Sequence, residues 1–262
     1  QGRALLDRAD LVDIVLGPDN IPELPELVQH IQDGGKSIAR TEFDLPQPSF
    51  LTAQVRPDRP EVSSYVTVMK GCDERCTYCI VPYTRGSERY RPAAEIVREI
   101  ETLCAGGVRE ITLLGQTVNS WHEPGLFPQL TAAAPDPEPQ AAGYRPFAEA
   151  HPAAAESQFA ELVRRIAREV PALARLRYTS PHPRHVTEAL VAAHRELSLL
   201  PAHLHLPMQS GSDRVLRRML RRYRRQTYLE RARALQASRP GFTLSTDIIV
   251  GFPGETEQDF ED

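Results

Sequence analysis

Three cysteines crowd into one short segment, Gly71-Cys72-Asp73-Glu74-Arg75-Cys76-Thr77-Tyr78-Cys79. Thiolates are soft ligands, and three of them on one loop can converge on a single metal centre. An iron–sulfur cluster held by Cys72, Cys76 and Cys79 would keep one iron without a protein thiolate, free to bind a substrate or cofactor. Structural zinc is the alternative, and it needs four ligands. The fourth cysteine, Cys104, lies on the apolar side of an expected helix and is predicted to pack as a small hydrophobic residue.

Two other groups of residues could also do chemistry. His203 and His205 share one face of an expected strand, which can ligate a metal, but a buried, hydrogen-bonded pair is preferred because no third ligand is evident. Six arginines are expected on one helical stretch: Arg217, Arg218, Arg221, Arg222, Arg224 and Arg225. They could contact RNA phosphates, but a solvated helix face is preferred because arginine dominates the basic residues of the whole chain.

Composition limits the class of protein. The chain has 262 residues, 41% hydrophobic and 25% charged, as in ordinary globular proteins. No apolar stretch approaches the roughly 18 residues of a membrane span, so no membrane segment or signal peptide is expected. The net charge of −4 shows no global basic signature for nucleic acid. Crowded cysteines without a secretory signal favour the reducing cytoplasm.

The elements that must position the cysteines alternate between two periodicities. Strands are expected at 65–69, 111–115, 176–179, 203–206 and 244–250. Helices are expected from 91 to the glycines at 106–107, and at 159–170, 186–197 and 213–237. This alternation predicts an α/β barrel or an open parallel sheet. The cysteine segment follows the first strand, at the sheet edge where ligands normally bind.

The flanking segments suggest a piece of a longer protein. A strand at 11–17 and a helix at 22–31 cannot bury their apolar faces alone, so residues 1–40 are interpreted as the tail of a preceding α/β domain. A proline-rich linker is expected at 41–62, and a flexible Pro/Ala-rich insertion without chemistry at about 122–157. The last expected helix starts after Gly254-Glu255-Thr256, so the core at 63–262 is expected to be incomplete at its end.

Several stretches, taken in order, resemble the radical S-adenosylmethionine (SAM) methylthiotransferases. They are Tyr65–Cys72, Ile80–Gly86, Arg91-Pro92, Leu113–Ser120, Thr179–Pro183, His205–Ser212 and Asp247–Thr256. The last three look most like the branch of the family that modifies tRNA. The resemblance implies a partial (β/α)6-type radical SAM barrel, truncated at its end and preceded by the tail of an amino-terminal methylthiotransferase domain.

The same resemblance implies a cofactor chemistry. A [4Fe-4S] cluster on Cys72, Cys76 and Cys79 would chelate S-adenosylmethionine through its open iron, and reductive cleavage would give a 5′-deoxyadenosyl radical. The radical would abstract hydrogen from C2 of N6-isopentenyladenosine beside the anticodon of tRNA, where a methylthio group is then added. A second cluster is expected on an amino-terminal part that this chain lacks. A flavodoxin or ferredoxin is expected to supply the electrons.

Cofactor contacts are assigned to polar groups at the ends of the strands, because such groups point into the site of a barrel. Tyr78 is expected against the adenine, and Gly115 and Gln116 near the amino group of the cofactor. Ribose or carboxylate contacts are assigned to three residues at later strand ends, Ser180, Gln209 and Asp247. Gly251 and Gly254 are expected to allow close backbone approach. No catalytic residue is assigned.

Two other functions stay open at this point. Within the same chemistry, the substrate could be threonylcarbamoyl-adenosine in tRNA or an aspartate of a ribosomal protein. In a different class, the chain could be a zinc-stabilised RNA-binding module without catalysis. Zinc without sulfide, and no cofactor cleavage, would identify that module.

Overall fold

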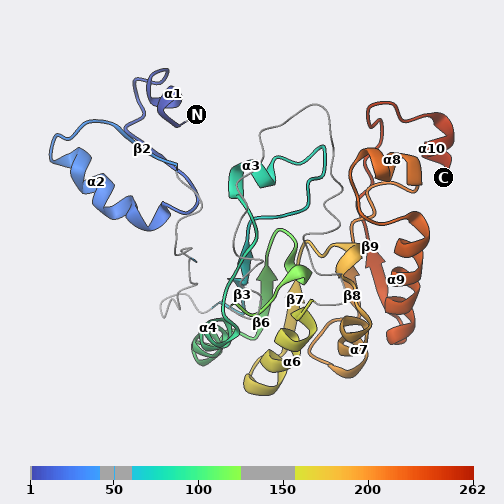
Figure 1. The fold of residues 1–262 in the computed structure, drawn as a ribbon. Helices are drawn as coiled ribbons and strands as arrows, with labels where there is room; N and C mark the ends of the chain where they lie inside the picture. Colours follow the sequence, from blue (N-terminus) through green and yellow to red (C-terminus); the bar gives the residue numbers. More distant parts are fainter. Residues whose placement is uncertain (1, 42–49, 51–60, 125–156) are drawn as a thin grey trace.

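The computed structural model describes residues 2–41, 50, 61–124 and 157–262. Most of the expected linker and insertion therefore lies outside the described residues. The chain forms a curved row of parallel strands with helices along one side, preceded by a smaller α/β unit (Figure 1).

The central strands run parallel and follow each other in chain order. Three form one sheet: β3 (Ser63–Thr67), β6 (Glu110–Leu114) and β7 (Arg175–Tyr178). A second parallel pair consists of β8 (His203–His205) and β9 (Thr243–Ser245). The five expected strands and the parallel α/β architecture are confirmed. The strand expected at 244–250 is shorter, because beyond Ser245 only an isolated bridge joins Ile248 to Gln209.

Each side of the sheet has a different environment. Val66, Ile111 and Leu176 are fully buried beneath the helices, whereas Tyr65, on the opposite face, is 64% exposed. The helices pack on one another in chain order: α4 (Ala93–Ala105), α6 (Phe159–Glu169), α7 (Glu188–Glu196) and α9 (Arg225–Ser238). Cys104 lies in this core, 4% exposed, as predicted. The buried face stabilises the sheet and leaves the other face to form a site.

The prediction of one long helix at 213–237 is wrong. The chain forms α8 (Asp213–Arg218) and then leaves the helix, with Leu220 at a left-handed φ of 56°, before α9 begins. Tyr223 turns inward, and its hydroxyl donates to the Met208 carbonyl over 2.7 Å. The six arginines therefore do not share one helix face. We call residues 219–224 the connector.

The amino-terminal unit is a small parallel βαβ arrangement. It contains α1 (Gly2–Leu6), β1 (Ile14–Leu16), η1 (Ile21–Glu23), α2 (Leu24–Gln32) and β2 (Ile38–Arg40). The expected strand and helix are confirmed with shorter bounds, while α1 and β2 are additions, since three residues of strand are too short to show alternation. The Asp19 carboxylate ties this unit to the core through Arg89 (2.7 Å) and Lys70 (3.1 Å).

Short elements surround the ends of the strands. They are β4 (Met69–Lys70), α3 (Val81–Arg85), β5 (Arg89–Tyr90), η2 (Val118–Ser120), η5 (Pro183–His185) and α10 (Glu257–Glu261). Thr256 caps α10 through a reciprocal hydrogen bond with Asp259, so the predicted helix start is confirmed. None of the described helices is long and apolar enough to cross a membrane.

Candidate metal cluster and cofactor site

The cysteine loop begins where β4 pairs with β5. Gly71 has a φ of 77°, and a Cβ at this position would lie 2.0 Å from the Ser87 carbonyl oxygen. The Cys72 N–H donates to the Gly86 carbonyl over 3.1 Å. Only glycine combines this backbone conformation with such close approach, so the hairpin fixes the direction in which the loop leaves the sheet.

Cys72 and Cys76 are buried, and Cys79 is partly exposed. The Cys79 N–H donates to the Cys76 carbonyl over 3.0 Å, which closes a turn between them. In the described residues no three His, Cys, Asp or Glu side chains converge as ligands of one metal ion. A cubane cluster places each thiolate on a different iron, so its ligands need not converge on one point. The three sulfurs of this loop fit the donor set of such a cluster.

The surroundings of Cys72 favour a neutral thiol until a metal binds. Burial, and secondarily the charge of Glu88, raise the pKa of Cys72 to about 12. The Thr117 hydroxyl lies 3.0 Å from the sulfur. A bound metal would remove the proton, because coordination stabilises the thiolate far more than burial opposes it.

The connector packs on the cysteine loop. The Thr77 N–H donates to the Met219 carbonyl over 3.1 Å, and the Arg221 guanidinium donates to the Cys76 sulfur over 3.2 Å. The aromatic ring of Tyr223 lies beneath that guanidinium, 5.1 Å from centroid to carbon. Arg221 therefore contacts the cysteine loop and does not lie on a solvated helix face.

Glu74 is a buried carboxylate in the middle of the loop. Its oxygens contact Arg184 (3.4 Å), His185 (3.8 Å) and Arg222 (3.8 Å). Burial would raise the pKa of Glu74, but the hydrogen bond from His185 and the charges of its basic neighbours outweigh it, so its pKa lies well below the usual range. The carboxylate thus joins the loop to η5 and to the connector.

The residues after β6 meet the cysteine loop from the other side. Gly115 is buried, and a Cβ there would lie 2.5 Å from Met69 Cγ, so the chain needs glycine for packing. Gln116 is exposed, and Thr117 reaches Cys72. The amide of Asn119 exchanges hydrogen bonds of 2.7 and 3.0 Å with the His182 backbone. The ends of β6 and β7 are thereby joined beside the loop.

Two predicted cofactor residues adopt a strained backbone. Ser180, after β7, has a φ of 57°, and Gln209, after β8, has a φ of 69°. The Gln209 N–H donates to the Asp247 carbonyl over 2.8 Å, so these two residues lie side by side. Non-glycine residues in the left-handed region cluster at binding sites, because the surrounding structure must hold them there. Tyr78 is 41% exposed on the cysteine loop.

The two glycines expected to allow close approach behave differently. A Cβ at Gly254 would lie 2.9 Å from an Arg218 nitrogen, so this backbone packs closely against the Arg218 side chain, while its approach to a cofactor stays a prediction. Gly251 has a φ of 71° and no neighbour within 4 Å of that position in the described residues, so close approach at Gly251 stays a prediction.

The histidines of β8 belong to a polar chain instead of a buried pair. His205 lies 2.9 Å from the Ser245 hydroxyl and 3.1 Å from the Asp247 carboxylate, and Ser245 lies 3.2 Å from His203. His203 is exposed and His205 partly so, because they line the face of β8 that the helices do not cover. The hydrogen bonds were predicted, whereas the burial was wrong.

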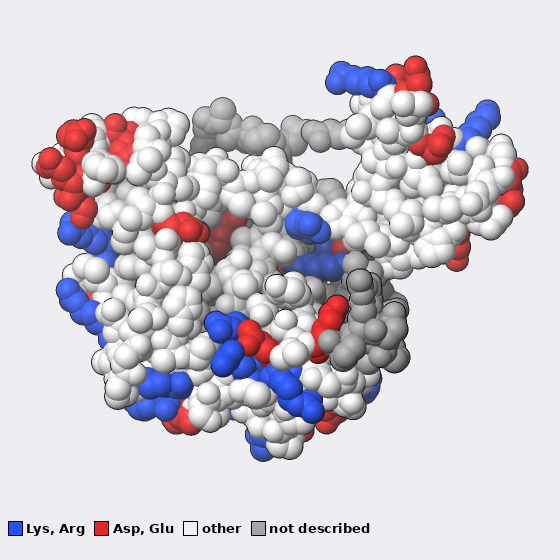
Figure 2. All heavy atoms as spheres, turned by 180° about the vertical axis from the view of Figure 1, so that it is seen from behind, with Lys and Arg blue, Asp and Glu red and all other residues white. Residues whose placement is uncertain are grey.

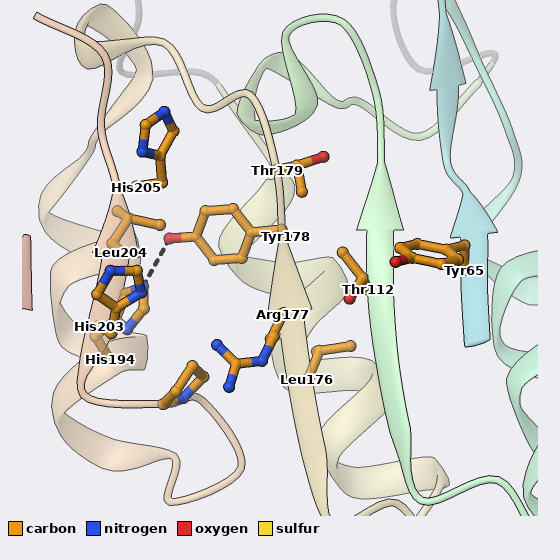
Figure 3. Close-up of a pocket in the computed structure, with 11 residues that line it drawn as sticks. Tyr65, Thr112, Leu176, Arg177, Tyr178, Thr179, His194, His203, Leu204 and His205 are labelled. Atoms are coloured by element: carbon orange, nitrogen blue, oxygen red, sulfur yellow. Dashed lines mark hydrogen bonds between the residues drawn. The ribbon is translucent and has the colours of Figure 1, made fainter. Parts of the chain in front are cut away.

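A pocket of about 260 Å³ lies on this uncovered face, between β7 and β8 (Figure 3). Three residues that pair across adjacent strands line it: Tyr65 of β3 pairs with Thr112 of β6, and Thr112 pairs with Arg177 of β7. Thr179 and His205 line its end nearest the carboxyl ends of the strands, where Ser180 and Asp247 follow. The pocket therefore extends from the predicted cofactor residues into the interior of the strand row.

Sequence patterns missed several residues that organise this site. Glu74, Thr117 and Arg221 carry no periodic signal, because they act through side-chain contacts with residues far away in the sequence. Glu88 is buried and contacts Tyr90 and Ser120, and burial raises its pKa to about 7. The only sequence signal for these residues was their place near cysteines or at the end of a strand.

Comparison with known proteins gives two kinds of match. Residues 66–262 match the family described as the Radical SAM superfamily. The chain is 57% identical, over 270 aligned positions, to the tRNA-2-methylthio-N(6)-dimethylallyladenosine synthase of Sorangium cellulosum (strain So ce56). That alignment covers 99% of this chain and 50% of the relative, so the chain spans about half the length of the curated protein it matches.

Solved structures of lower identity share the fold. The radical S-adenosylmethionine methyltransferase TsrM from Kitasatospora setae, with tryptophan and a SAM analogue bound, superposes with a TM-score of 0.58 at 16% identity. The match covers 94% of this chain and 47% of TsrM. The cobalamin-dependent radical enzyme OxsB gives a TM-score of 0.52 at 13% identity, over 94% and 38% of the two chains.

Proposed function

The chain belongs to the radical SAM superfamily, and we propose that it carries the cluster- and cofactor-binding part of a methylthiotransferase. The proposed substrate is N6-isopentenyladenosine beside the anticodon of tRNA, which would receive a methylthio group at C2. The single observation that carries this proposal is 57% identity, across nearly the whole chain, to a relative named for that product. The cysteine loop beside the ends of parallel strands supports it.

In this proposal Cys72, Cys76 and Cys79 hold a [4Fe-4S] cluster. When bound, the cluster supplies the electron that cleaves S-adenosylmethionine to a 5′-deoxyadenosyl radical. The chain itself binds and orients the cofactor. Gln209 and Asp247 present adjacent polar groups at the carboxyl ends of the strands.

In the same proposal, each remaining cofactor residue has its own role. Ser180 and Gln116 follow β7 and β6 with exposed polar side chains, and Tyr78, on the cysteine loop, offers its ring for packing against the adenine. Gly115 keeps the end of β6 close to Met69, so that no side chain separates the strand end from the cofactor. The polar chain from Asp247 to His203 holds the Asp247 carboxylate in one orientation.

The proposal also names partners outside this chain. A flavodoxin or ferredoxin would deliver the electron, and the reaction would take place in the cytoplasm. A second cluster, on an amino-terminal part of the whole protein, would handle sulfur. Residues 1–40 would be the tail of that amino-terminal domain, and residues 63–262 the radical SAM core.

Metal analysis of the chain tests the cluster. After anaerobic reconstitution, iron, acid-labile sulfide and zinc are measured in the wild type, in Cys76→Ala and in Cys104→Ala. About four irons with matching sulfide are expected in the wild type and in Cys104→Ala, whose cysteine is buried in α4, but not in Cys76→Ala. About one zinc per chain without sulfide would instead establish the zinc-stabilised module.

Nucleoside analysis tests the substrate. A strain that lacks the gene is complemented with the full-length gene, and its tRNA nucleosides are measured by mass spectrometry. Restoration of the methylthio group on isopentenyladenosine supports the proposal. Restoration on threonylcarbamoyl-adenosine, or on a ribosomal-protein aspartate, would assign the chain to another branch of the family.

A further inference from the structure

The connector, together with residues of α8 and α9 on either side of it, lines a hollow of about 370 Å³ that contains four arginines. They are Arg217, Arg221, Arg222 and Arg224. One carboxylate, Asp213, also lines it and accepts a hydrogen bond from the Arg225 N–H over 2.7 Å. The hollow thus has an excess of positive charge in a chain whose net charge is negative.

These arginines are of two kinds. Arg221 and Arg222 are partly buried and point at Cys76 and Glu74 of the cysteine loop. Arg217 and Arg224 are exposed, and neither guanidinium has a hydrogen-bond or ion-pair partner among the residues that the structure describes; their backbone carbonyls accept hydrogen bonds. Like charges around one hollow repel each other, so an anion placed between them relieves that repulsion.

The position of the hollow suggests the anion. Its wall is the connector, whose backbone is bonded to the cysteine loop through Thr77 and Met219. A base that reacts at the cluster would have its own backbone phosphates beside this loop. We propose that the arginine hollow binds a backbone phosphate of the RNA next to the modified nucleotide; this inference rests on the proposed function.

The charges around the hollow favour binding of an extended polyanion along one direction. Acidic side chains gather over α10, at one edge of the molecule (Figure 2). That edge lies next to α8, since Arg214 binds Asp259. A strand of RNA would be repelled from α10 and attracted to the connector, which directs it along the cysteine loop.

Binding of a stem-loop RNA tests the inference. The probe is a fluorescently labelled anticodon stem-loop, and its dissociation constant is measured against salt for the chain of residues 1–262. The variant combines Arg217→Gln with Arg224→Gln. The matched control combines Arg195→Gln with Arg233→Gln, two exposed arginines of α7 and α9 with the same change in charge.

We expect the variant with Arg217→Gln and Arg224→Gln to bind about tenfold more weakly than the control. The slope of log K against log salt should fall by about 0.7, because the hollow holds one phosphate and each neutralised phosphate contributes about 0.7 for single-stranded nucleic acid. A stem-loop with a scrambled loop sequence should lose the same factor, because phosphates carry no sequence information.

Equal affinity and slope in the two double variants would overturn the phosphate site, and so would a wild-type chain that does not bind the probe. Neither result touches the cluster, which is measured separately as iron and sulfide in the same preparations. A chain that binds RNA through these arginines but holds zinc would instead overturn the proposed function alone.

Discussion

The guanidinium of Arg221 donates a hydrogen bond to the sulfur of Cys76, with 3.2 Å between Nη1 and Sγ. Positive charge and hydrogen bonds at a cluster sulfur stabilise the reduced state and raise its reduction potential. We expect Arg221→Gln to lower the potential of the reconstituted cluster by about 60 mV, which is a tenfold change for one electron. The measurement is a redox titration followed by electron paramagnetic resonance.

Two variants serve as controls for this effect. Arg221→Lys keeps the charge and should lose only part of the shift, whereas Arg217→Gln removes a charge that contacts no cysteine. An unchanged potential in Arg221→Gln, with full iron content, would show that the contact does not act on the cluster.

Glu74 is expected to stabilise the cysteine loop. Replacement by Gln would leave Arg184, His185 and Arg222 around a neutral, buried group, and loss of one partner of a buried ion pair costs about 3 kcal/mol. Urea unfolding of the metal-free chain measures the change. Glu196→Gln breaks an exposed pair with Arg164 and should cost less than about 1 kcal/mol. Equal losses in the two variants would contradict the role of Glu74.

Acid should destabilise the core through His194. Its ring lies 2.6 Å from the Tyr178 hydroxyl, and burial, with a smaller contribution from Arg239, lowers the pKa of His194 to about 4. The unfolded chain therefore binds this proton more readily, and stability falls as the pH drops from about 6.5 towards 4, by up to about 3 kcal/mol.

The free energy of unfolding at pH 7 and pH 5 measures this dependence. His194→Gln should be less stable at pH 7 and should lose less stability between the two values, since the carboxyl groups titrate alike in both chains. Parallel losses in the two chains would rule out His194 as the source.

Gly71 should tolerate no side chain. Alanine there meets the Ser87 carbonyl at 2.0 Å in addition to its left-handed φ, whereas Gly241 has a φ of 72° with nothing within 4 Å. Gly241→Ala should cost about 1 kcal/mol, and Gly71→Ala at least about 3 kcal/mol together with most of the bound iron. Urea unfolding and iron analysis compare them. Similar costs would mean that the hairpin can relax.

The sequence predicted the parallel strands well, because alternation and helical spacing report burial of one face. It placed Cys72, Gly115 and Ser180 at the ends of strands, which the structure confirms. It did not predict the break at Leu220, because helix propensity runs through 213–237 and the break depends on Tyr223 bonding to Met208 across the fold. The contacts of Glu74 were missed for the same reason.

The strained residues Ser180 and Gln209 offer a test that separates stability from binding. Glycine removes the cost of a left-handed backbone, about 1 to 2 kcal/mol, but adds back part of it as entropy of the unfolded chain. Ser180→Gly and Gln209→Gly should therefore be slightly more stable than the wild type, by up to about 1 kcal/mol. Each should nonetheless bind S-adenosylmethionine about tenfold more weakly when the cluster is loaded.

Calorimetry of cofactor binding and urea unfolding of the same preparations give both quantities. Gln209→Asn is the matched variant, because asparagine tolerates the left-handed region and keeps an amide on a shorter side chain. Its stability should match that of the wild type, while its affinity for S-adenosylmethionine should lie between those of the wild type and Gln209→Gly. If the glycine variants gain stability and keep full affinity, the strain has another origin, and the cofactor contacts must come from other residues at the ends of the strands.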